Sequence, residues 1–396
     1  MIPLTFLVIT LIAMAGCLQS CGENPPPEGP PEDPPSMQSV QLFEWRVSAR
    51  LTFSDGYRLA QSSPRFRHDD PVGRPGQGPG QPESGQTLDA QAMYRDSTAF
   101  FSLKDPTIVK HEGRWHLFCT RRAVNPSHSI EYLSFPDWND ETPQERVILP
   151  FQGRGVRSPQ VFFYRPLQSW FLLFEKLRSN SVGSRAEPFF TSTKVLDDPH
   201  SWSPPRQIEL PLPDPAVGWG DFWFISDQKR ACLFMTSKEG RLFRAETTPE
   251  DFPYGWSEPV VCLGGDFIEA GHVYRVEEWD RYLAVIVASR YLKRYIKAYV
   301  AESLGGTWER IAVTRAQPFI SPVNVSCDYE PWADSFGHGE IVRRSPDETM
   351  PIRIKDCTVL LPTVLRRQMN GKLYREVPWK LALLELFRVE VEFPSE

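Results

Sequence analysis

The 396-residue sequence lacks three features that would each point to a large class of proteins. It has no long run of Lys or Arg and a net charge of −6, so it carries no electrostatic footprint for nucleic acid. None of its seven cysteines has a C-x-x-C or Cys/His spacing that suggests zinc, and their scatter through apolar runs favours buried free thiols over a disulfide framework. From residue 100 onward no convincing helical periodicity is present. These absences argue against a nucleic-acid partner and favour an all-β fold.

The first 22 residues have the pattern of an export signal. Residues 2–14 are almost wholly apolar, a run too short to span a bilayer as a mature helix. The Ala-Gly before Cys17 resembles a bacterial lipobox, in which the Cys is diacylated and becomes the first mature residue; Cys21 is a weaker candidate. No Lys or Arg precedes the apolar core, so an ordinary cleaved signal or a membrane anchor stays open. We expect an exported cell-surface or periplasmic lipoprotein, or else a secreted protein, that meets the membrane only through its lipid anchor.

Two irregular stretches lie near the start of the folded domain. Residues 23–39, which begin ENPPPEGPPEDPPS, predict an extended Pro-rich tether that cannot pack. Residues 57–91, which include VGRPGQGPGQPESGQ, predict a long irregular insertion. Between them, residues 40–53 alternate well enough to form a strand. The sequence therefore predicts a signal, a tether and one domain over residues 40–393.

Five segments after residue 100 share one layout. Each of the first four opens with a polar or small residue, continues as an apolar strand, turns, and forms a second apolar strand. In the first, DPTIVKHEGRWHLFCTRR, the turn falls at Glu112-Gly113. The openings are roughly 50 to 70 residues apart, the length of one four-stranded propeller blade with its loops. They predict a five-bladed β-propeller and lie at Asp105, Ser158, Asp221, Glu269 and His338.

Three of these openings are carboxylates: Asp105, Asp221 and Glu269. The first strand of every propeller blade lines the central axis, so the three would meet in one funnel. A carboxylate inside an apolar run is costly to bury unless it is paired or functional. Glycoside hydrolysis uses one ionised and one protonated carboxyl group, and a third acid nearby can raise the pKa of the proton donor. The residues favour a polysaccharide-active enzyme, although any one of these acids could instead cap a turn.

Distinctive segments then occur in a fixed order along the chain: SLKDPTIV, HEGRWHLF, YLSFPDW, SPQVFFY, DFWFISD, GRLFRAETTPEDFP, GWSEP, FIEAGHVYRV, SLGGTWERIA, FGHGEIVR, PDETM and YREVPWKLALL. In these segments, the chain from about residue 51 to residue 386 resembles glycoside hydrolase family 62, the inverting α-L-arabinofuranosidases that act on arabinoxylan. The resemblance implies a five-bladed β-propeller with a pocket for one terminal furanose, set in a cleft for the xylan backbone.

The resemblance also assigns roles to the acids. Asp105 of LKDPT corresponds to the general base that activates a water, and Glu269 of FIEA to the general acid that protonates the departing oxygen. Asp221 of GDFWFISD corresponds to the third carboxylate, which tunes the acid and orients the sugar. Asp227 is the alternative for this role, and Asp221 is preferred because it heads the strand. An inverting enzyme must fit a water beside the sugar, so the Asp105 and Glu269 carboxyls are expected roughly 6.5–9.5 Å apart.

The expected substrate contacts, besides Asp227, are Lys104, Gln160 and Tyr374. Lys104 resembles a sugar-contacting lysine of the family, with a surface lysine at the strand end as the alternative. Gln160 of SPQVFF lies where a polar group of the second blade faces the pocket, unless it is a structural cap. Tyr374 matches a tyrosine that borders the sugar site. Arg375 stands where the family usually has a smaller amide, which puts the contact to the xylan backbone in doubt.

His338 of FGHGEIV matches a family histidine that reaches the propeller axis and helps to hold a calcium ion, whose other ligands are mostly waters. Calcium prefers oxygen ligands, so binding through one imidazole would be weak, and a buried core histidine is the alternative. His272 of EAGHVY follows the acid closely and is expected to be a packed strand histidine. No organic cofactor is implied.

The sequence therefore predicts an exo-acting, inverting α-L-arabinofuranosidase that removes terminal arabinofuranosyl side groups from arabinoxylan or a related polysaccharide. A related five-bladed glycosidase, such as a β-xylosidase or an arabinanase, is one alternative. A non-catalytic sugar-binding surface lipoprotein is another, although such a protein would not need all three acids. Nothing in the sequence suggests an obligate oligomer, and we expect a monomer.

Overall fold

The structure is a computed structural model, and every described residue belongs to one compact unit, Pro35–Glu396. The expected signal, both lipobox cysteines, the Pro-rich tether and the 57–91 insertion lie outside the described residues. Within the described part of the chain, no helix is long and apolar enough to cross a membrane. The described residues are 42–50, 100–123, 128–138, 145–180, 183–211, 218–290, 293–327 and 333–393.

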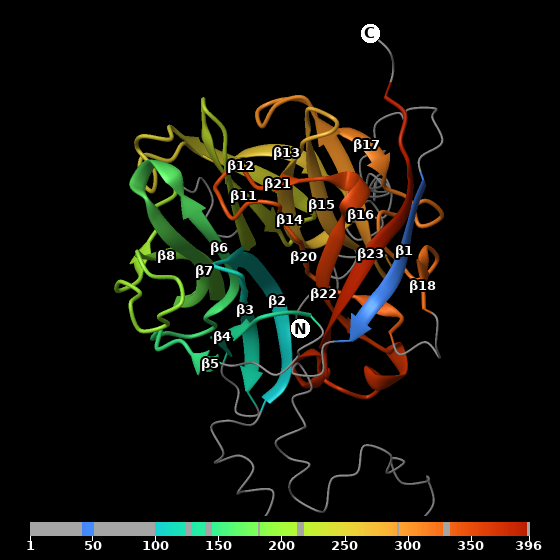
Figure 1. Ribbon diagram of the computed structural model, residues 1–396, viewed down its shortest axis with the longest axis horizontal. Coiled ribbons are helices and arrows are strands. Elements are labelled where there is room, and N and C mark those ends of the chain that lie inside the picture. Colours follow the sequence, from blue (N-terminus) through green and yellow to red (C-terminus); the bar gives the residue numbers. More distant parts are fainter. Residues whose placement is uncertain are drawn as a thin grey trace, which may run out of the picture. The chain divides into compact units, whose positions relative to one another are not determined.

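Five β-sheets follow one another around a common axis as a five-bladed β-propeller, which confirms the predicted fold class (Figure 1). In each of the first four blades the first strand lies innermost. The first blade contains β2 (Phe100–His111), β3 (Arg114–Ala123), β4 (His128–Phe135) and β5 (Glu145–Ile148), and the second contains β6 (Arg157–Tyr164), β7 (Ser169–Asn180), β8 (Gly183–Thr193) and β9 (Arg206–Gln207). The third contains β10 (Trp219–Ser226), β11 (Ala231–Ser237), β12 (Arg241–Thr247) and β13 (Val260–Gly264), and the fourth contains β14 (Phe267–Val276), β15 (Arg281–Arg290), β16 (Lys293–Ala301) and β17 (Glu309–Ala312).

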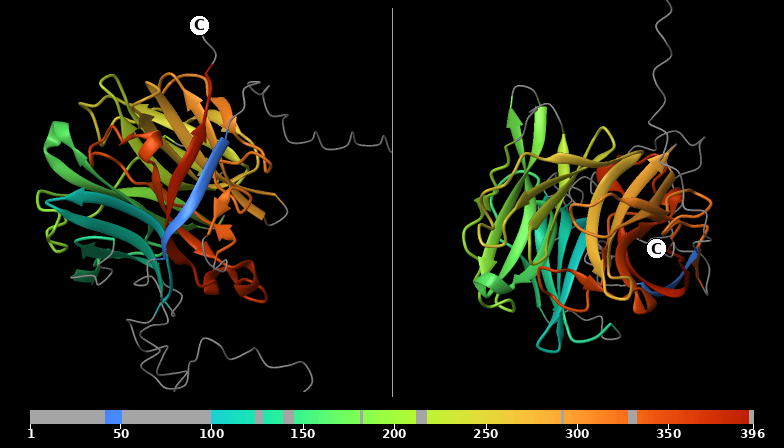
Figure 2. Two further views of the ribbon diagram at one scale, coloured as in Figure 1. Left: turned by 45° about the vertical axis from the view of Figure 1, so that its right-hand side comes forward. Right: turned by 90° about the horizontal axis from the view of Figure 1, so that it is seen from above.

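The fifth blade closes the ring with strands from both ends of the domain (Figure 1, Figure 2). Here β1 (Leu42–Arg50) lies antiparallel to β23 (Lys380–Glu390), the last strand of the chain. Trp45 of β1 is fully buried, and its indole N–H donates to the carbonyl of Phe319 at 2.6 Å. The strand predicted at residues 40–53 is thus present over 42–50. The remaining strands of this blade are β18 (Val325–Ser326), β19 (Ser335–Phe336), β20 (Glu340–Ile341) and β22 (Thr358–Val364).

The inner strands are buried on both faces because each is packed between neighbouring blades, which explains their continuous apolar runs. Ile108 of β2, for example, has no exposed surface. The core lies mainly between adjacent blades. Phe162 of β6 stacks on Phe224 of β10 with ring centroids 4.7 Å apart, which fixes the second blade against the third. This packing holds the inner strands at set positions around the axis.

One end of the axis is closed by residues 343–352, which we call the basal segment. This segment leaves β20, runs across the ends of the inner strands, and finishes as β21 (Pro351–Ile352), which pairs in parallel with β14. Inner strands of the second, third and fourth blades each donate a backbone N–H to it, in the pairs Phe163–Pro346, Ser226–Glu348 and Arg275–Met350. Among the described residues, the basal segment thus closes this end of the axis and leaves the opposite end for a ligand.

Arg343 begins the basal segment and fills the axis beneath the site. Its guanidinium donates to the carbonyls of Ile108 at 3.2 Å and Val161 at 2.8 Å, and it pairs with Glu340 at 2.7 Å. Arg343 is 8% exposed and Glu340 is fully buried. A buried ion pair is tolerated only when its polar atoms are also hydrogen-bonded, as those of Arg343 are here.

Candidate active site

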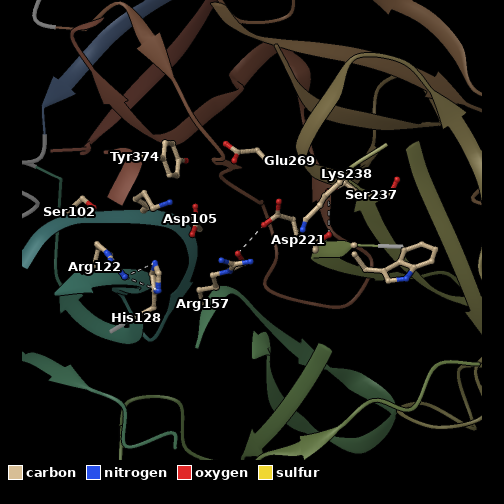
Figure 3. Close-up of a pocket in the computed structure, with 16 residues that line it drawn as sticks. Ser102, Asp105, Arg122, His128, Arg157, Asp221, Ser237, Lys238, Glu269 and Tyr374 are labelled. Carbon is tan, nitrogen blue, oxygen red and sulfur yellow. Dashed lines mark hydrogen bonds between the residues drawn. The ribbon is translucent and has the colours of Figure 1, made fainter. Parts of the chain in front are cut away.

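The open end of the axis holds a cavity of about 310 Å³ (Figure 3). Asp105, Asp221 and Glu269 all line it, each from a different blade, and the predicted contact residues Lys104 and Tyr374 line it as well. The structure therefore brings together the three predicted carboxylates. Other residues that line the cavity include Arg122, Arg157, Ser158, Gly218, Trp219, Ser237 and Lys238.

The four complete inner strands share a β-bulge at the level of the cavity. Asp105, Ser158, Asp221 and Ala270 have φ values of 49°, 51°, 53° and 54°, and the register with the neighbouring strand shifts at each of them. A left-handed conformation costs roughly 1–2 kcal/mol for a residue that has a Cβ atom, although Asp tolerates it better than most residues. Bulges re-aim side chains, and strain at four equivalent positions is typical of a functional site.

Asp221 is held by donors from three other blades. The Ser158 hydroxyl donates to its Oδ1 at 3.0 Å, the backbone N–H of Ala270 donates to its Oδ2 at 3.2 Å, and His338 Nδ1 lies 3.4 Å from Oδ1. Burial opposes ionisation, but His338, Arg157 and the Ala270 N–H outweigh it and hold the pKa of Asp221 well below its ordinary value. Asp221 is therefore an ionised carboxylate at the centre of the site.

His338 lies on the axis between β19 and β20. Its Nδ1 is 3.4 Å from Asp221 and 3.9 Å from Asp105; burial opposes its charge, but these carboxylates raise its pKa to about 9. On its other side, Nε2 is 2.7 Å from Nε2 of His272, whose ring stacks on Trp223 with centroids 3.8 Å apart. Burial and the neighbouring His338 lower the pKa of His272 well below its ordinary value, so His272 accepts the Nε2–H of His338. His338 is thus a buried cation that links two of the acids.

The residues around His338 do not fit the calcium ion predicted there. Both of its ring nitrogens face other side chains, Nδ1 at 3.4 Å from Asp221 and Nε2 at 2.7 Å from His272, so neither is free for a metal ion. Within the described residues, no group of three or more His, Cys, Asp and Glu side chains could hold a metal ion. The calcium ion stays a prediction, and no step below uses one.

Asp105 of β2 is the least restrained of the three acids. It is 7% exposed, and no hydrogen bond within the described residues uses its carboxylate. Its one ion-pair neighbour in this part of the chain is His338, at 3.9 Å. The carboxylate therefore keeps its acceptor positions for a group inside the cavity, such as a water.

Glu269 of β14 is positioned by Arg294 of β16. The guanidinium of Arg294 forms an ion pair with Glu269 and donates from Nη2 to the Tyr374 hydroxyl at 3.2 Å. The half-exposed Tyr374 ring in turn lies 5.0 Å from the ammonium of Lys104. Burial opposes the charge on Lys104, yet Asp105 and Tyr374 raise its pKa above the ordinary value. Glu269, Arg294, Tyr374 and Lys104 thus form one connected side of the pocket.

Two predicted contact residues do not line the cavity, and these predictions are corrected. Gln160 is 1% exposed; its amide donates to the carbonyl of Phe224 and accepts the N–H of the same residue, both at 2.7 Å. It therefore ties β6 to β10, the structural role that the sequence left open. Asp227 follows the far end of β10, about 20 Å along the strand from Asp221. Its carboxylate accepts the backbone N–H groups of Lys229 and Arg230 at 2.7 and 2.8 Å and caps the turn to β11.

Several residues of the site were missed by sequence reasoning. Arg157 forms an ion pair with the buried Glu175, whose other oxygen accepts the backbone N–H of Asp221 at 3.0 Å. A signal for Arg157 was present, because Arg157-Ser158-Pro159 repeats the Lys104-Asp105-Pro106 pattern at the opening of the previous blade. Arg294 had no such signal. It lies on the third strand of its blade, and only the tertiary fold brings it to Glu269.

Comparisons with known proteins cover the same part of the chain. The sequence profile of glycosyl hydrolase family 62 matches residues 87–385. Alpha-L-arabinofuranosidase C of Cellvibrio japonicus is 29% identical over 296 residues, which are 72% of this chain and 44% of that protein. The chain thus spans less than half the length of this relative.

Solved structures of similar proteins share the fold. The catalytic domain of the GH62 α-L-arabinofuranosidase of Coprinopsis cinerea is 25% identical, with a TM-score of 0.70 and coverage of 88% of this chain and 98% of that one. The α-L-arabinofuranosidase PaAbf62A of Podospora anserina, solved with cellotriose, is 23% identical, with a TM-score of 0.68 and the same coverage. Since the family profile matches most of the sequence and includes all three carboxylates of the pocket, the chain belongs to glycosyl hydrolase family 62.

Proposed function

We propose that the protein is an exo-acting, inverting α-L-arabinofuranosidase that hydrolyses terminal arabinofuranosyl side groups of arabinoxylan or a related polysaccharide. The observation that carries this proposal is the convergence of Asp105, Asp221 and Glu269, from three blades, on one pocket. The names of the Cellvibrio and Coprinopsis relatives, both arabinofuranosidases, support it.

The acids divide the reaction between them. Asp105, whose oxygens are free of hydrogen bonds within the described structure, takes a proton from the water that attacks the anomeric carbon. Glu269 donates a proton to the glycosidic oxygen as that bond breaks, which leaves a free hydroxyl on the polymer. The ionised Asp221 stabilises the positive charge that develops on the furanose ring. The sugar is released as arabinose with inverted configuration.

The closed base of the pocket favours exo action. His338 lies beneath the acids, and Arg343 with the basal segment blocks the axis below it. A polymer chain cannot thread along such an axis, whereas the terminal sugar of a side group can enter the pocket from its open end.

Incubation of the chain from residue 37 onward with arabinoxylan, followed by proton NMR, tests the proposal. We expect free arabinose as the product, formed first as the β-anomer because the linkage is α and the mechanism inverts it. First appearance of the α-anomer would contradict inversion. Xylose or arabino-oligosaccharides as products would indicate a β-xylosidase or an arabinanase. Failure to release sugar from any arabinose-bearing polymer would favour a sugar-binding lipoprotein.

We also propose that the protein is exported and anchored by a lipid on Cys17 or Cys21, and that it is a monomer. The apolar run over residues 2–14 and the small residues before Cys17 support the anchor. Labelling with radioactive palmitate in a bacterial host should mark the full chain, and either Cys17→Ala or Cys21→Ala should abolish the label. A chain that stays unlabelled and appears in the medium would indicate ordinary secretion instead.

A further inference from the structure

Each of the first two blades supports the bulge of the next blade with a side chain from its second strand. Thr120 of β3 and Glu175 of β7 occupy equivalent positions, each opposite the residue that precedes the bulge of its own blade. The Thr120 hydroxyl accepts the backbone N–H of Ser158 at 2.8 Å, and the carboxylate at the equivalent position accepts the backbone N–H of Asp221 at 3.0 Å. A neutral hydroxyl thus performs this task in the first blade, and burying a carboxylate is costly. Glu175, which is 1% exposed, should therefore do more than support a backbone.

The second partner of Glu175 is Arg157, which lines the cavity (Figure 3). Burial opposes the charge of this guanidinium, but Glu175 raises its pKa, and the nearby carboxylates Asp221 and Asp105 raise it further. Both acids of the pocket are thus close enough to attract the arginine. Within the described residues, however, the only ion pair of Arg157 is with Glu175. One buried carboxylate therefore anchors a guanidinium that the acids would otherwise attract.

A direct pair between Arg157 and Asp105 would hinder the proposed reaction. Arginine commonly donates to both oxygens of a carboxylate at once. Such a pair would occupy the acceptor positions that Asp105 needs for the attacking water, and it would make the carboxylate a weaker base. In the structure, these positions accept no hydrogen bond from any described residue. Anchoring of Arg157 at Glu175 explains how Asp105 stays free beside a guanidinium.

We propose that Glu175 is a positioning residue, which fixes the backbone of Asp221 and holds Arg157 away from Asp105. This inference deepens the proposed function and rests on it, because it assumes that Asp105 is the base. Glu175 lies behind the cavity wall, so it acts on the reaction only through these neighbours. Its removal should therefore impair turnover more than binding of the substrate.

Two variants separate this role from simple packing. Glu175→Gln keeps one oxygen to accept the N–H of Asp221, but its amide NH₂ faces Arg157 as a second donor, so the ion pair is lost. For arabinose release from arabinoxylan, kcat should fall about 10- to 100-fold while KM changes less, the cost of a misplaced group beside the reacting acids. The double variant Glu175→Gln with Arg157→Met should have a kcat several-fold above that of Glu175→Gln, because no guanidinium is then left to bond Asp105.

Glu187→Gln is the matched control variant, because Glu187 is also buried in the β7–β8 hairpin and paired with an arginine, Arg185, at 2.9 Å. It should keep the wild-type kcat. All kcat values are taken per folded protein, with the folded fraction measured by circular dichroism. A wild-type kcat for Glu175→Gln, or a double variant no more active than Glu175→Gln, would overturn the positioning role. Failure of the wild-type protein to release arabinose from arabinoxylan would instead refute the proposed function.

Discussion

At the scale of single residues, the site is a set of charges that hold one another in place. Asp221 is kept ionised by His338, Arg157 and the Ala270 N–H, and Glu269 is fixed by Arg294. Asp105 has no comparable restraint within the described residues. Three acids of similar chemistry thus receive separate environments.

Substitution of the two reacting acids should distinguish their roles. Asp105→Asn and Glu269→Gln should each lower kcat on arabinoxylan by about 10²–10⁴-fold, the range for loss of a general acid or base. On 4-nitrophenyl α-L-arabinofuranoside, whose leaving group needs little protonation, Glu269→Gln should recover much of its rate and Asp105→Asn should not. Steady-state kinetics with both substrates measures this. Asp227→Asn is the control and should keep wild-type kcat. If Asp105→Asn recovered its rate on the 4-nitrophenyl substrate and Glu269→Gln did not, Asp105 would be the general acid and Glu269 the general base.

Arg294 should act by positioning Glu269. Arg294→Met removes the ion pair to Glu269 and the hydrogen bond to Tyr374. Because a small misplacement of a catalytic group costs up to about 10²-fold, kcat should fall by about 10- to 100-fold while KM changes less. The matched control is Arg281→Met, which breaks a more exposed pair with Glu302 in the same blade. A variant whose kcat stays at the wild-type value would remove Arg294 from the positioning role.

At the scale of elements, the innermost strands and the basal segment build the pocket between them. The bulged strands aim side chains at the axis, and the basal segment supplies its closed end. The fifth blade differs, because β19 and β20 are short and His338 lies between them. Next to His338, the backbone at Gly339 lies close against Leu360 and Leu361 of β22.

Gly339 should be intolerant of a side chain. An added Cβ would lie 2.2 Å from Leu361 Cβ and 2.5 Å from the carbonyl oxygen of Leu360. Gly339→Ala should therefore lower the free energy of unfolding by about 1–3 kcal/mol, the usual cost of overpacking, and should also lower kcat by displacing His338. Urea denaturation measures the first effect. Gly264→Ala, whose Cβ would meet nothing within 4 Å, should be close to neutral, and equal losses in both variants would refute the packing explanation.

Arg343 should be needed to keep Glu340 buried. Arg343→Met leaves a buried carboxylate without its partner and should cost about 3–5 kcal/mol of unfolding free energy. The double variant Arg343→Met with Glu340→Gln should recover part of that loss, because it removes the unpaired charge. Chemical denaturation of the two single variants and the double variant gives the coupling. Additive losses would show that the ion pair is not what supports the axis.

At the scale of the whole molecule, one early strand holds the ring shut. β1 pairs with β23 over its full length, from Leu42 opposite Glu390 to Arg50 opposite Ala382. Because β23 runs away from the pocket, the chain enters the propeller at the basal end, and β1 then runs toward the pocket end. Leu42, where the described chain begins, therefore lies on the side opposite the active site.

Truncation should reveal the importance of this closure. A chain that begins at residue 52 lacks β1 and the buried Trp45, so one edge of β23 loses its partner. We expect it to unfold at a temperature at least about 10 °C lower than a chain that begins at residue 37, or not to fold, since losing a strand exposes several large apolar side chains. Circular dichroism during heating is the measurement. Equal unfolding temperatures would show that β1 does not hold the ring.

The sequence by itself determined the five-bladed fold and three acids of the site. Strand periodicity, the turn at Glu112-Gly113 and the spacing of the blade openings are patterns that can be read locally in the sequence. In a propeller the inner strand of each blade lines the axis, irrespective of the contacts that its side chains make. Only the tertiary structure decided which neighbours those acids have. Gln160 bonds across to β10 of the next blade, and Asp227 lies in the turn at the far end of β10. Arg294 contacts Glu269 from the third strand of its blade. The physical reason is that alternation fixes the face of a strand, whereas bulges and inter-blade packing, which depend on residues distant in sequence, fix the position of a side chain along the axis.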